Sequence, residues 1–196
     1  MTQTFDTIIV GAGMVGAALA TGLGQQGIRV ALIDQASPTP YQPDNSPDIR
    51  VSALSAGSER YLASLGAWPR MLAMRATRYC RLAVWDGTPN PLKRLVPRSL
   101  TEVEFDANSL GAPHLGHIVE NSITQLALWQ TAETETDVTL ITGHSVRDLV
   151  QSAEYATVTL DDGSQLQAQL VVGADGAMSR VRELAGIGVT RDQYEQ

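Results

Sequence analysis

Two glycine-rich turns could bind phosphate, and each follows an apolar run typical of a buried strand. The first turn follows residues 7–10 and has the spacing Gly-X-Gly-X-X-Gly. In this spacing the first glycine makes a tight turn, the second lets backbone N–H groups approach a pyrophosphate, and the third lets helix and strand pack closely. It predicts a dinucleotide held at a positive helix N-terminus. The turn consists of Gly11, Ala12, Gly13, Met14, Val15 and Gly16.

The elements around this turn have the order of a nucleotide-binding βαβ unit. Residues 5–10 predict a strand, residues 14–25 a helix ended by Gly27, and residues 28–33 a second strand. Asp34 follows the second strand, where a carboxylate can accept hydrogen bonds from the ribose hydroxyls of an adenine nucleotide. The alternative is that Asp34 is an ordinary carboxylate at an exposed strand end.

The second glycine turn places a carboxylate between two glycines. Gly173, Ala174, Asp175 and Gly176 follow residues 170–172, and a short basic helix closed by Gly186 comes next. Because the carboxyl ends of strands in a doubly wound sheet share one crevice, this turn is expected to reach the ligand of the first. The alternative is a plain tight turn followed by a solvated helix face.

Arg50 is a candidate phosphate ligand because a guanidinium offers a rigid fork of donors. It follows a proline-rich loop over residues 36–48 and precedes a predicted helix over residues 51–65. The alternative to a phosphate ligand is an ordinary surface arginine.

The remaining pattern predicts an α/β fold, namely a Rossmann-like domain in which a parallel sheet and helices are joined by a β-meander. Residues 79–105 predict short antiparallel strands, 120–134 a helix, and 138–141 a strand. Residues 145–150, 155–160 and 166–172 predict the meander, with a turn at Asp162 and Gly163. We assign residues 1–75 and 117–190 to the nucleotide-binding domain and residues 76–116 to an inserted set of strands.

Composition excludes several classes of protein. The chain has 196 residues and a formal charge of −7, which argues against nucleic acid as a partner. We expect a metal-free protein of the reducing cytoplasm. Cys80 is the single cysteine, no Cys/His pattern has metal-ligand spacing, and no secretion signal or membrane span is visible in the sequence. We interpret three histidines as structural residues rather than general bases, namely His114, His117 and His144. Only residues 79–105 are a candidate wall of a pocket for an aromatic substrate.

Four segments resemble the class A flavoprotein aromatic hydroxylases and, within them, the hydroxylases of ubiquinone biosynthesis. The tail over residues 184–189 and the stretch 74–85 look most like the demethoxyubiquinol hydroxylase branch, with the octaprenylphenol hydroxylase branch a near second. The four segments are the first glycine turn, residues 50–55, residues 114–121 with 127–129, and residues 170–182.

This resemblance implies FAD as cofactor and NAD(P)H as co-substrate. Gly11, Gly13 and Gly16, with Met14 and Val15, would lie at the pyrophosphate, and Asp34 at the adenosine ribose. Reduced flavin would pass oxygen from a C4a-hydroperoxide to a prenylated phenol or quinol ring. The resemblance also implies a cytoplasmic protein that is peripheral to the inner membrane or to a biosynthetic complex. The other implied cofactor contacts are Arg50 with Val51 near the flavin-side phosphate, Asn121 through its side chain, Val146 through its backbone, and Asp175.

The sequence departs from this family in length, and no catalytic acid or base is assigned. Family members continue well past Gln196, into a Gly-Asp turn that caps the flavin and into most of the substrate domain. The expectation is therefore a truncated hydroxylase that is inactive alone. Two alternatives stay open: an FAD-binding or assembly module without turnover, and another FAD enzyme such as an isoprenoid reductase.

Overall fold

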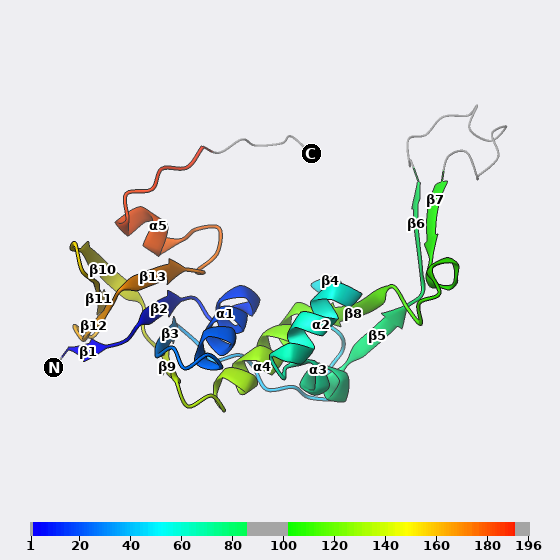
Figure 1. The fold of residues 1–196 in the computed structure, drawn as a ribbon, viewed down its shortest axis with the longest axis horizontal. Coiled ribbons are helices and arrows are strands. Elements are labelled where there is room, and N and C mark those ends of the chain that lie inside the picture. The colour runs from blue at the N-terminus through cyan, green and yellow to red at the C-terminus, as the bar shows by residue number, and fades with distance from the viewer. Residues whose placement is uncertain (1, 86–101, 191–196) are drawn as a thin grey trace.

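A four-stranded parallel sheet forms the middle layer of the molecule, with the strand order β13-β2-β3-β9 (Figure 1). The computed structural model describes residues 2–85 and 102–190. Strands β2 and β3 are buried almost throughout, which explains why their sequences are continuous apolar runs rather than alternating ones. The four strands are β2 (Thr7–Val10), β3 (Val30–Asp34), β9 (Val138–Thr142) and β13 (Leu170–Gly173).

Consecutive side chains of the central strands enter two different cores. Ile9 and Leu32 pack among residues of the helices α1 (Met14–Gly24) and α4 (Asn121–Ala132). Ile8 and Ile33 point the other way and pack against a second, mainly antiparallel sheet. That sheet has the order β1-β12-β11-β10, from β1 (Gln3–Thr4), β12 (Gln165–Ala168), β11 (Ala156–Leu160) and β10 (Val146–Gln151).

These layers confirm the predicted α/β class, with one change in the meander. The predicted strand over residues 166–172 is two strands that belong to different sheets. β12 pairs antiparallel with β11, and after Gln169 the chain enters the parallel sheet as β13 beside β2. An unbroken run of strand-forming residues does not reveal such a change of sheet, because each half has strand character.

The prediction of one helix over residues 51–65 is wrong at its beginning. Strand β4 (Val51–Ser55) pairs antiparallel with β8 (Gly116–Glu120), and helix α2 (Ala56–Ser64) begins only afterwards. The Ser55 side chain accepts a hydrogen bond from the Ser58 N–H and so caps the helix at this point. Helix α3 (Trp68–Met74) and strand β5 (Ala76–Tyr79) follow, and β5 completes the sheet β4-β8-β5.

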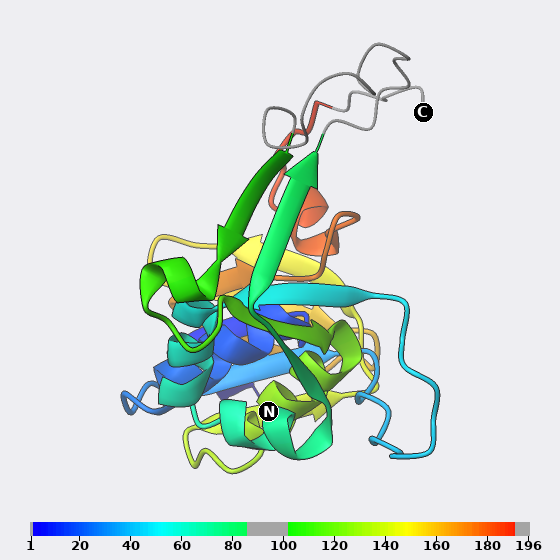
Figure 2. The same ribbon diagram turned by 90° about the vertical axis from the view of Figure 1, so that its right-hand side faces the viewer.

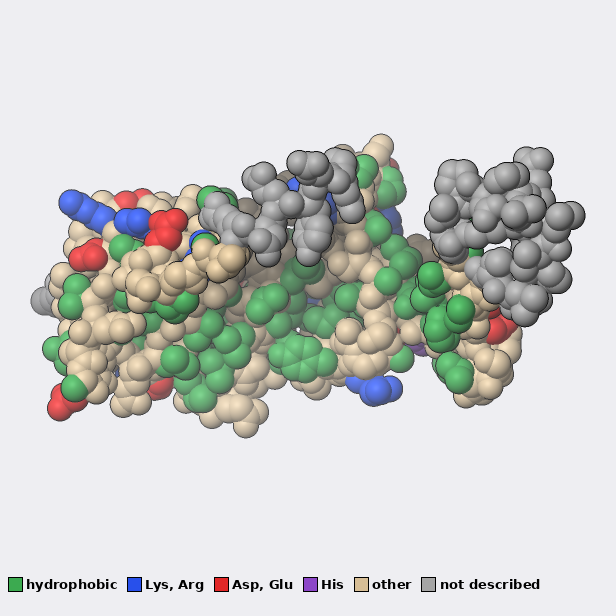
Figure 3. Space-filling model, turned by 90° about the horizontal axis from the view of Figure 1, so that it is seen from above, with side chains coloured by type: hydrophobic (Ala, Val, Ile, Leu, Met, Phe, Trp, Pro, Cys, Tyr) green, Lys and Arg blue, Asp and Glu red, His purple; other side chains and the backbone are tan. Residues whose placement is uncertain are grey.

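A β-hairpin extends from this smaller sheet and has one uncovered apolar face. Strand β6 (Arg81–Trp85) pairs antiparallel with β7 (Glu102–Asp106), and a short 3₁₀ helix η3 (Ala107–Leu110) follows. The predicted turns and apolar residues within 86–101 lie outside the described residues. Figure 3 shows the apolar side chains at the hairpin end of the molecule. Leu82, Val84, Val103 and Phe105 share one face, and each is at least 47% exposed.

Two further segments frame the edge of the central sheet at which the glycine turns lie. The loop from β3 to β4 runs out along one side of the molecule (Figure 2). Helix α5 (Arg180–Leu184) follows the second glycine turn. Within the described residues, no helix combines the length and the apolar character needed to cross a membrane.

Glu59 joins helix α2 to strand β8 through two histidines. Its carboxylate oxygens lie 2.5 Å from His117 Nδ1 and 2.8 Å from His114 Nε2, and Glu59 and His117 are buried. Burial acts to raise the pKa of Glu59, but the hydrogen bonds from His117 and His114 outweigh it and leave that pKa below its ordinary value. His114 and His117 thus share one carboxylate partner, and their structural role stays a prediction.

The sequence shows no metal-ligand spacing among Glu59, His114 and His117, because Glu59 precedes His114 by 55 positions. The donor atoms of the three side chains nevertheless lie within 4.8 Å of one another, as do those of His144, Asp161 and Asp162. The absence of a metal therefore stays a prediction.

Replacing Glu59 by Gln should lower the free energy of unfolding by about 1–3 kcal/mol at pH 7, because charge-assisted hydrogen bonds are lost. A depressed carboxyl pKa stabilises the fold above its unfolded value of about 4.5, and that contribution is lost as the pH falls through the folded pKa. The difference between the two proteins should therefore shrink below about pH 4.5. Urea unfolding at several pH values checks this, with the exposed Glu154→Gln as control; an equal difference at pH 7 and pH 4 would contradict it.

Candidate cofactor-binding site

The two glycine turns lie against each other at the carboxyl edge of the parallel sheet. Val10 and Gly173 are partners in the β2–β13 pairing, so each strand enters its turn at the same level. Gly11 has a φ of 100°, and a side chain on it would collide with the carbonyl of Ala174. The Ala174 N–H in turn donates to the carbonyl of Val10 at 2.7 Å. The two turns are thus in direct contact, and binding of one ligand by both stays a prediction.

A cleft of about 680 Å³ opens beside these turns. Of the predicted cofactor residues, it brings together Gly11, Gly13, Asp34, Val146 and Asp175. The volume lies within the range of about 300–1,000 Å³ that is usual for small-molecule sites. Its other lining residues are Val10, Ile33, Gln35, Gln125, His144, Ser145, Ala174, Gly176 and Arg180.

The N-terminus of helix α1 points a row of backbone N–H groups at this cleft. Gly13 is the N-cap and has no side chain that could cap the helix, so the first-turn amides are left for another acceptor. A Cβ added to Gly13 would meet no heavy atom within 4 Å, whereas one added to Gly16 would collide with the Gly11 carbonyl. The open space at Gly13 and the packed contact at Gly16 fit a pyrophosphate over the first turn.

Asp34 is held rigidly at the rim of the cleft. Its Oδ2 accepts a hydrogen bond from the Ala12 N–H at 2.6 Å, and its Oδ1 accepts one from the Ala36 N–H at 3.2 Å. Each carboxylate oxygen has a second lone pair, so the side chain can still accept bonds from a ribose. Asp34 therefore both fixes the glycine turn and remains available to a ligand.

Asp175 organises the second glycine turn. One carboxylate oxygen accepts the Ser179 hydroxyl at 2.5 Å, and the other accepts the backbone N–H groups of Arg180 at 2.6 Å and Val181 at 3.1 Å. Partial burial acts to raise the pKa of Asp175, but the hydrogen bonds from the Ser179 hydroxyl and from backbone amides outweigh it and lower that pKa. The carboxylate thus holds the turn in shape, and Asp175 is one of the residues that line the cleft.

Six predicted residues do not line this cleft. Met14, Val15 and Gly16 follow Gly13 at the start of helix α1, whereas Arg50, Val51 and Asn121 lie close to one another elsewhere. The Asn121 N–H donates to the Arg50 carbonyl at 3.0 Å, and the Ser52 hydroxyl donates to Asn121 Oδ1 at 2.6 Å. Val51 is the strand partner of Glu120, the residue before Asn121. Arg50 is exposed, and its guanidinium makes no hydrogen bond or ion pair within residues 2–85 and 102–190. The candidate contacts thus form two groups, one in the cleft and one around Arg50.

Gln125 is a cleft residue that the sequence analysis missed. Its Nε2 donates to the carbonyl of Ala12 at 3.1 Å and so joins helix α4 to the first glycine turn. The signal was present in the spacing, because Gln125 follows Asn121 by four positions and lies on the same helix face.

The match to known families agrees with this geometry. The family model described as an FAD binding domain matches residues 4–195. Among solved structures, the chain resembles the probable FAD-dependent monooxygenase pqsL from Pseudomonas aeruginosa, with a TM-score of 0.72, 24% identity, and coverage of 98% of this chain and 48% of that one. It also resembles p-nitrophenol 4-monooxygenase PnpA from Pseudomonas putida, with a TM-score of 0.71, 21% identity, and coverage of 94% and 44%. These similarities show the fold.

Two curated relatives match this chain at higher sequence identity than these structures do. The chain is 43% identical to the 3-demethoxyubiquinol 3-hydroxylase of Escherichia coli over 99% of this chain and 47% of that protein. It is 35% identical to the mitochondrial ubiquinone biosynthesis monooxygenase of Xenopus tropicalis over 97% of this chain and 41% of that protein. The chain thus spans about half the length of the curated relatives it matches. The chain belongs to the family of FAD-binding domains, and within that family it is similar to a demethoxyubiquinol hydroxylase and to a ubiquinone biosynthesis monooxygenase.

Proposed function

We propose that this chain is the FAD-binding half of a hydroxylase that uses NAD(P)H and O₂ to hydroxylate a prenylated phenol or quinol ring in ubiquinone biosynthesis. The observation that carries the proposal is the cleft that gathers both glycine turns with Asp34 and Val146. The named activities of the curated relatives support the reaction type.

Each group of predicted residues takes one part of the cofactor in this proposal. The amides of the Gly11–Gly16 turn, including those of Met14 and Val15, hold the pyrophosphate, and Asp34 accepts the ribose hydroxyls. The Val146 backbone lies near the adenine. Arg50, Val51 and Asn121 hold the flavin-side phosphate and its neighbourhood, and Asp175 supports both the cofactor and the use of NAD(P)H.

The protein's share of the chemistry is binding, orientation and the exclusion of water. Bound FAD supplies electron transfer from NAD(P)H and the activation of O₂. The uncovered face of the hairpin, formed by Leu82, Val84, Val103 and Phe105, is the proposed apolar wall beside the substrate ring. Residues 76–116 accordingly form part of the substrate domain, whereas residues 1–75 and 117–190 form the FAD domain.

A second candidate is an FAD-binding module without turnover of its own. It is favoured by one observation, namely that the family model matching residues 4–195 is described only as an FAD binding domain. The two candidates share the cofactor site and differ in whether a second half completes an active enzyme. Either would work at the cytoplasmic side of the inner membrane or on a biosynthetic complex, as the sequence analysis expected.

Gly13→Ala should weaken FAD binding about tenfold, or about 1.4 kcal/mol, because its methyl group enters the space proposed for the pyrophosphate. Its backbone has a φ of −66°, which alanine adopts freely, so the free energy of unfolding should change by less than about 0.5 kcal/mol. Gly16→Ala should instead lower stability, because its methyl group would strike the Gly11 carbonyl. Flavin fluorescence titration and urea unfolding measure the two effects, with Gly188→Ala as control; unchanged affinity in Gly13→Ala would contradict the site.

A chimaera tests the reaction itself. This chain is fused to the half of the Escherichia coli hydroxylase that lies beyond the matched region, and NAD(P)H oxidation and demethoxyubiquinol hydroxylation are assayed beside the chain alone. The proposal expects hydroxylated product from the chimaera and none from the chain alone. A chimaera that binds FAD but forms no product would favour the binding module.

A further inference from the structure

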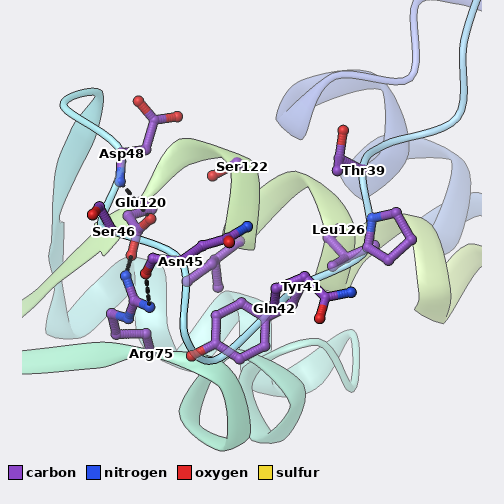
Figure 4. Close-up of a pocket in the computed structure, with 12 residues that line it drawn as sticks. Thr39, Tyr41, Gln42, Asn45, Ser46, Asp48, Arg75, Glu120, Ser122 and Leu126 are labelled. Carbon is purple, nitrogen blue, oxygen red and sulfur yellow. Dashed lines mark hydrogen bonds and ion pairs between the residues drawn. The ribbon is translucent and has the colours of Figure 1, made fainter.

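A partly buried ion pair contacts the loop that leads to Arg50 (Figure 4). Arg75 Nη1 lies 3.0 Å from Glu120 Oε1, and Glu120 is only 8% exposed. The other end of the guanidinium donates to the carbonyls of Asn45 at 2.9 Å and Pro43 at 3.3 Å. Arg75, the C-cap residue of helix α3, thus joins the end of that helix to the end of strand β8 and to the loop, which uses the forked geometry of arginine.

The same contacts continue to the two predicted residues of the flavin-side group. Glu120 Oε2 accepts the Asp48 N–H at 2.7 Å, and Asp48 Oδ1 accepts the Arg50 N–H at 3.0 Å. The Arg50 carbonyl then accepts the Asn121 N–H at 3.0 Å. An unbroken series of hydrogen bonds therefore runs from Arg75 to the backbones of Arg50 and Asn121.

Tyr41 anchors the first part of this loop, because it packs against the core and its hydroxyl donates to the Met74 carbonyl at 3.1 Å. The part that leads on to Arg50 has little such packing. A pocket of about 330 Å³ separates it from helix α4, where Ile123 and Leu126 form the facing wall. Residues 42–50 are exposed in the structure, and β4 begins only at Val51. Beyond Tyr41, the position and direction of the loop therefore depend mainly on the polar contacts of Arg75 and Glu120.

We propose that Arg75 is a positioning residue for the phosphate contact of Arg50, acting through Glu120 and Asp48. The inference rests on the proposed function, since Arg50 is there assigned to the flavin-side phosphate of FAD. A long side chain can bind one phosphate oxygen reproducibly only if its backbone is fixed. Arg75 supplies that fixation and does not itself touch the cofactor.

The first test compares two ligands on the same variants. Arg75→Met should weaken FAD binding about tenfold, whereas AMP binding, followed by NMR shifts at the Val146 amide, should stay within about twofold. AMP lacks the flavin-side phosphate and reports only on the cleft around Asp34. Arg75→Lys should recover part of the FAD affinity, because an ammonium can pair with Glu120 but cannot span both loop carbonyls. Equal losses for FAD and AMP would show a general defect of the fold and overturn the proposal.

Two further variants keep the test decisive if Arg75→Met folds poorly. Asp48→Ala removes the acceptor for the Arg50 N–H, leaves the ion pair intact, and should also weaken FAD selectively. In an Arg50→Met background, Arg75→Met should cost little additional FAD affinity, because both act on one contact. Full affinity in Asp48→Ala, or fully additive losses in the double variant, would overturn the proposal. An unaltered chain that binds no FAD would instead overturn the proposed function, and this inference with it.

Discussion

The close approach of two backbone turns is the constraint on which the rest of the structure depends. The parallel pairing of β2 with β13 brings Gly11 and Ala174 so near that no side chain fits between them. The same approach places the first turn of α1 and the Asp175 carboxylate on one cleft. Because the chain carries a net charge of −7, an anionic ligand there must be held by backbone dipoles and a few placed cations.

The proposed cofactor site has one part built on buried strands and another that depends on a hydrogen-bonded loop. The cleft is built on the carboxyl ends of buried strands, and Asp34 ties its rim to the glycine turn. Arg50 lies at the end of a loop beside a pocket, and polar contacts fix this part of the loop. Under the proposed function, rigid strands would therefore determine where the adenosine end binds, whereas a hydrogen-bonded loop would determine how precisely the flavin end is held.

Local patterns predicted the βαβ unit, Asp34 and the second turn, because glycine spacing and strand ends follow from nearby residues. The features that could not be predicted depend on contacts between residues far apart in the sequence. Residues 51–55 form a strand only because β8 lies beside them, and Glu59 meets His114 and His117 only after folding. The Arg75–Glu120 pair was likewise invisible, since its two members are 45 positions apart. Such pairs leave no periodic trace in one sequence.

The central claim is that one FAD molecule contacts both glycine turns. Amide hydrogen exchange of the chain with and without FAD tests this most directly, because it reports on each backbone N–H separately. The account predicts that FAD slows exchange together at the Gly11–Val15 amides, at Val146, and at the Asp175–Gly176 turn. Slowed exchange confined to one of the two turns, with FAD bound at saturation, would contradict it.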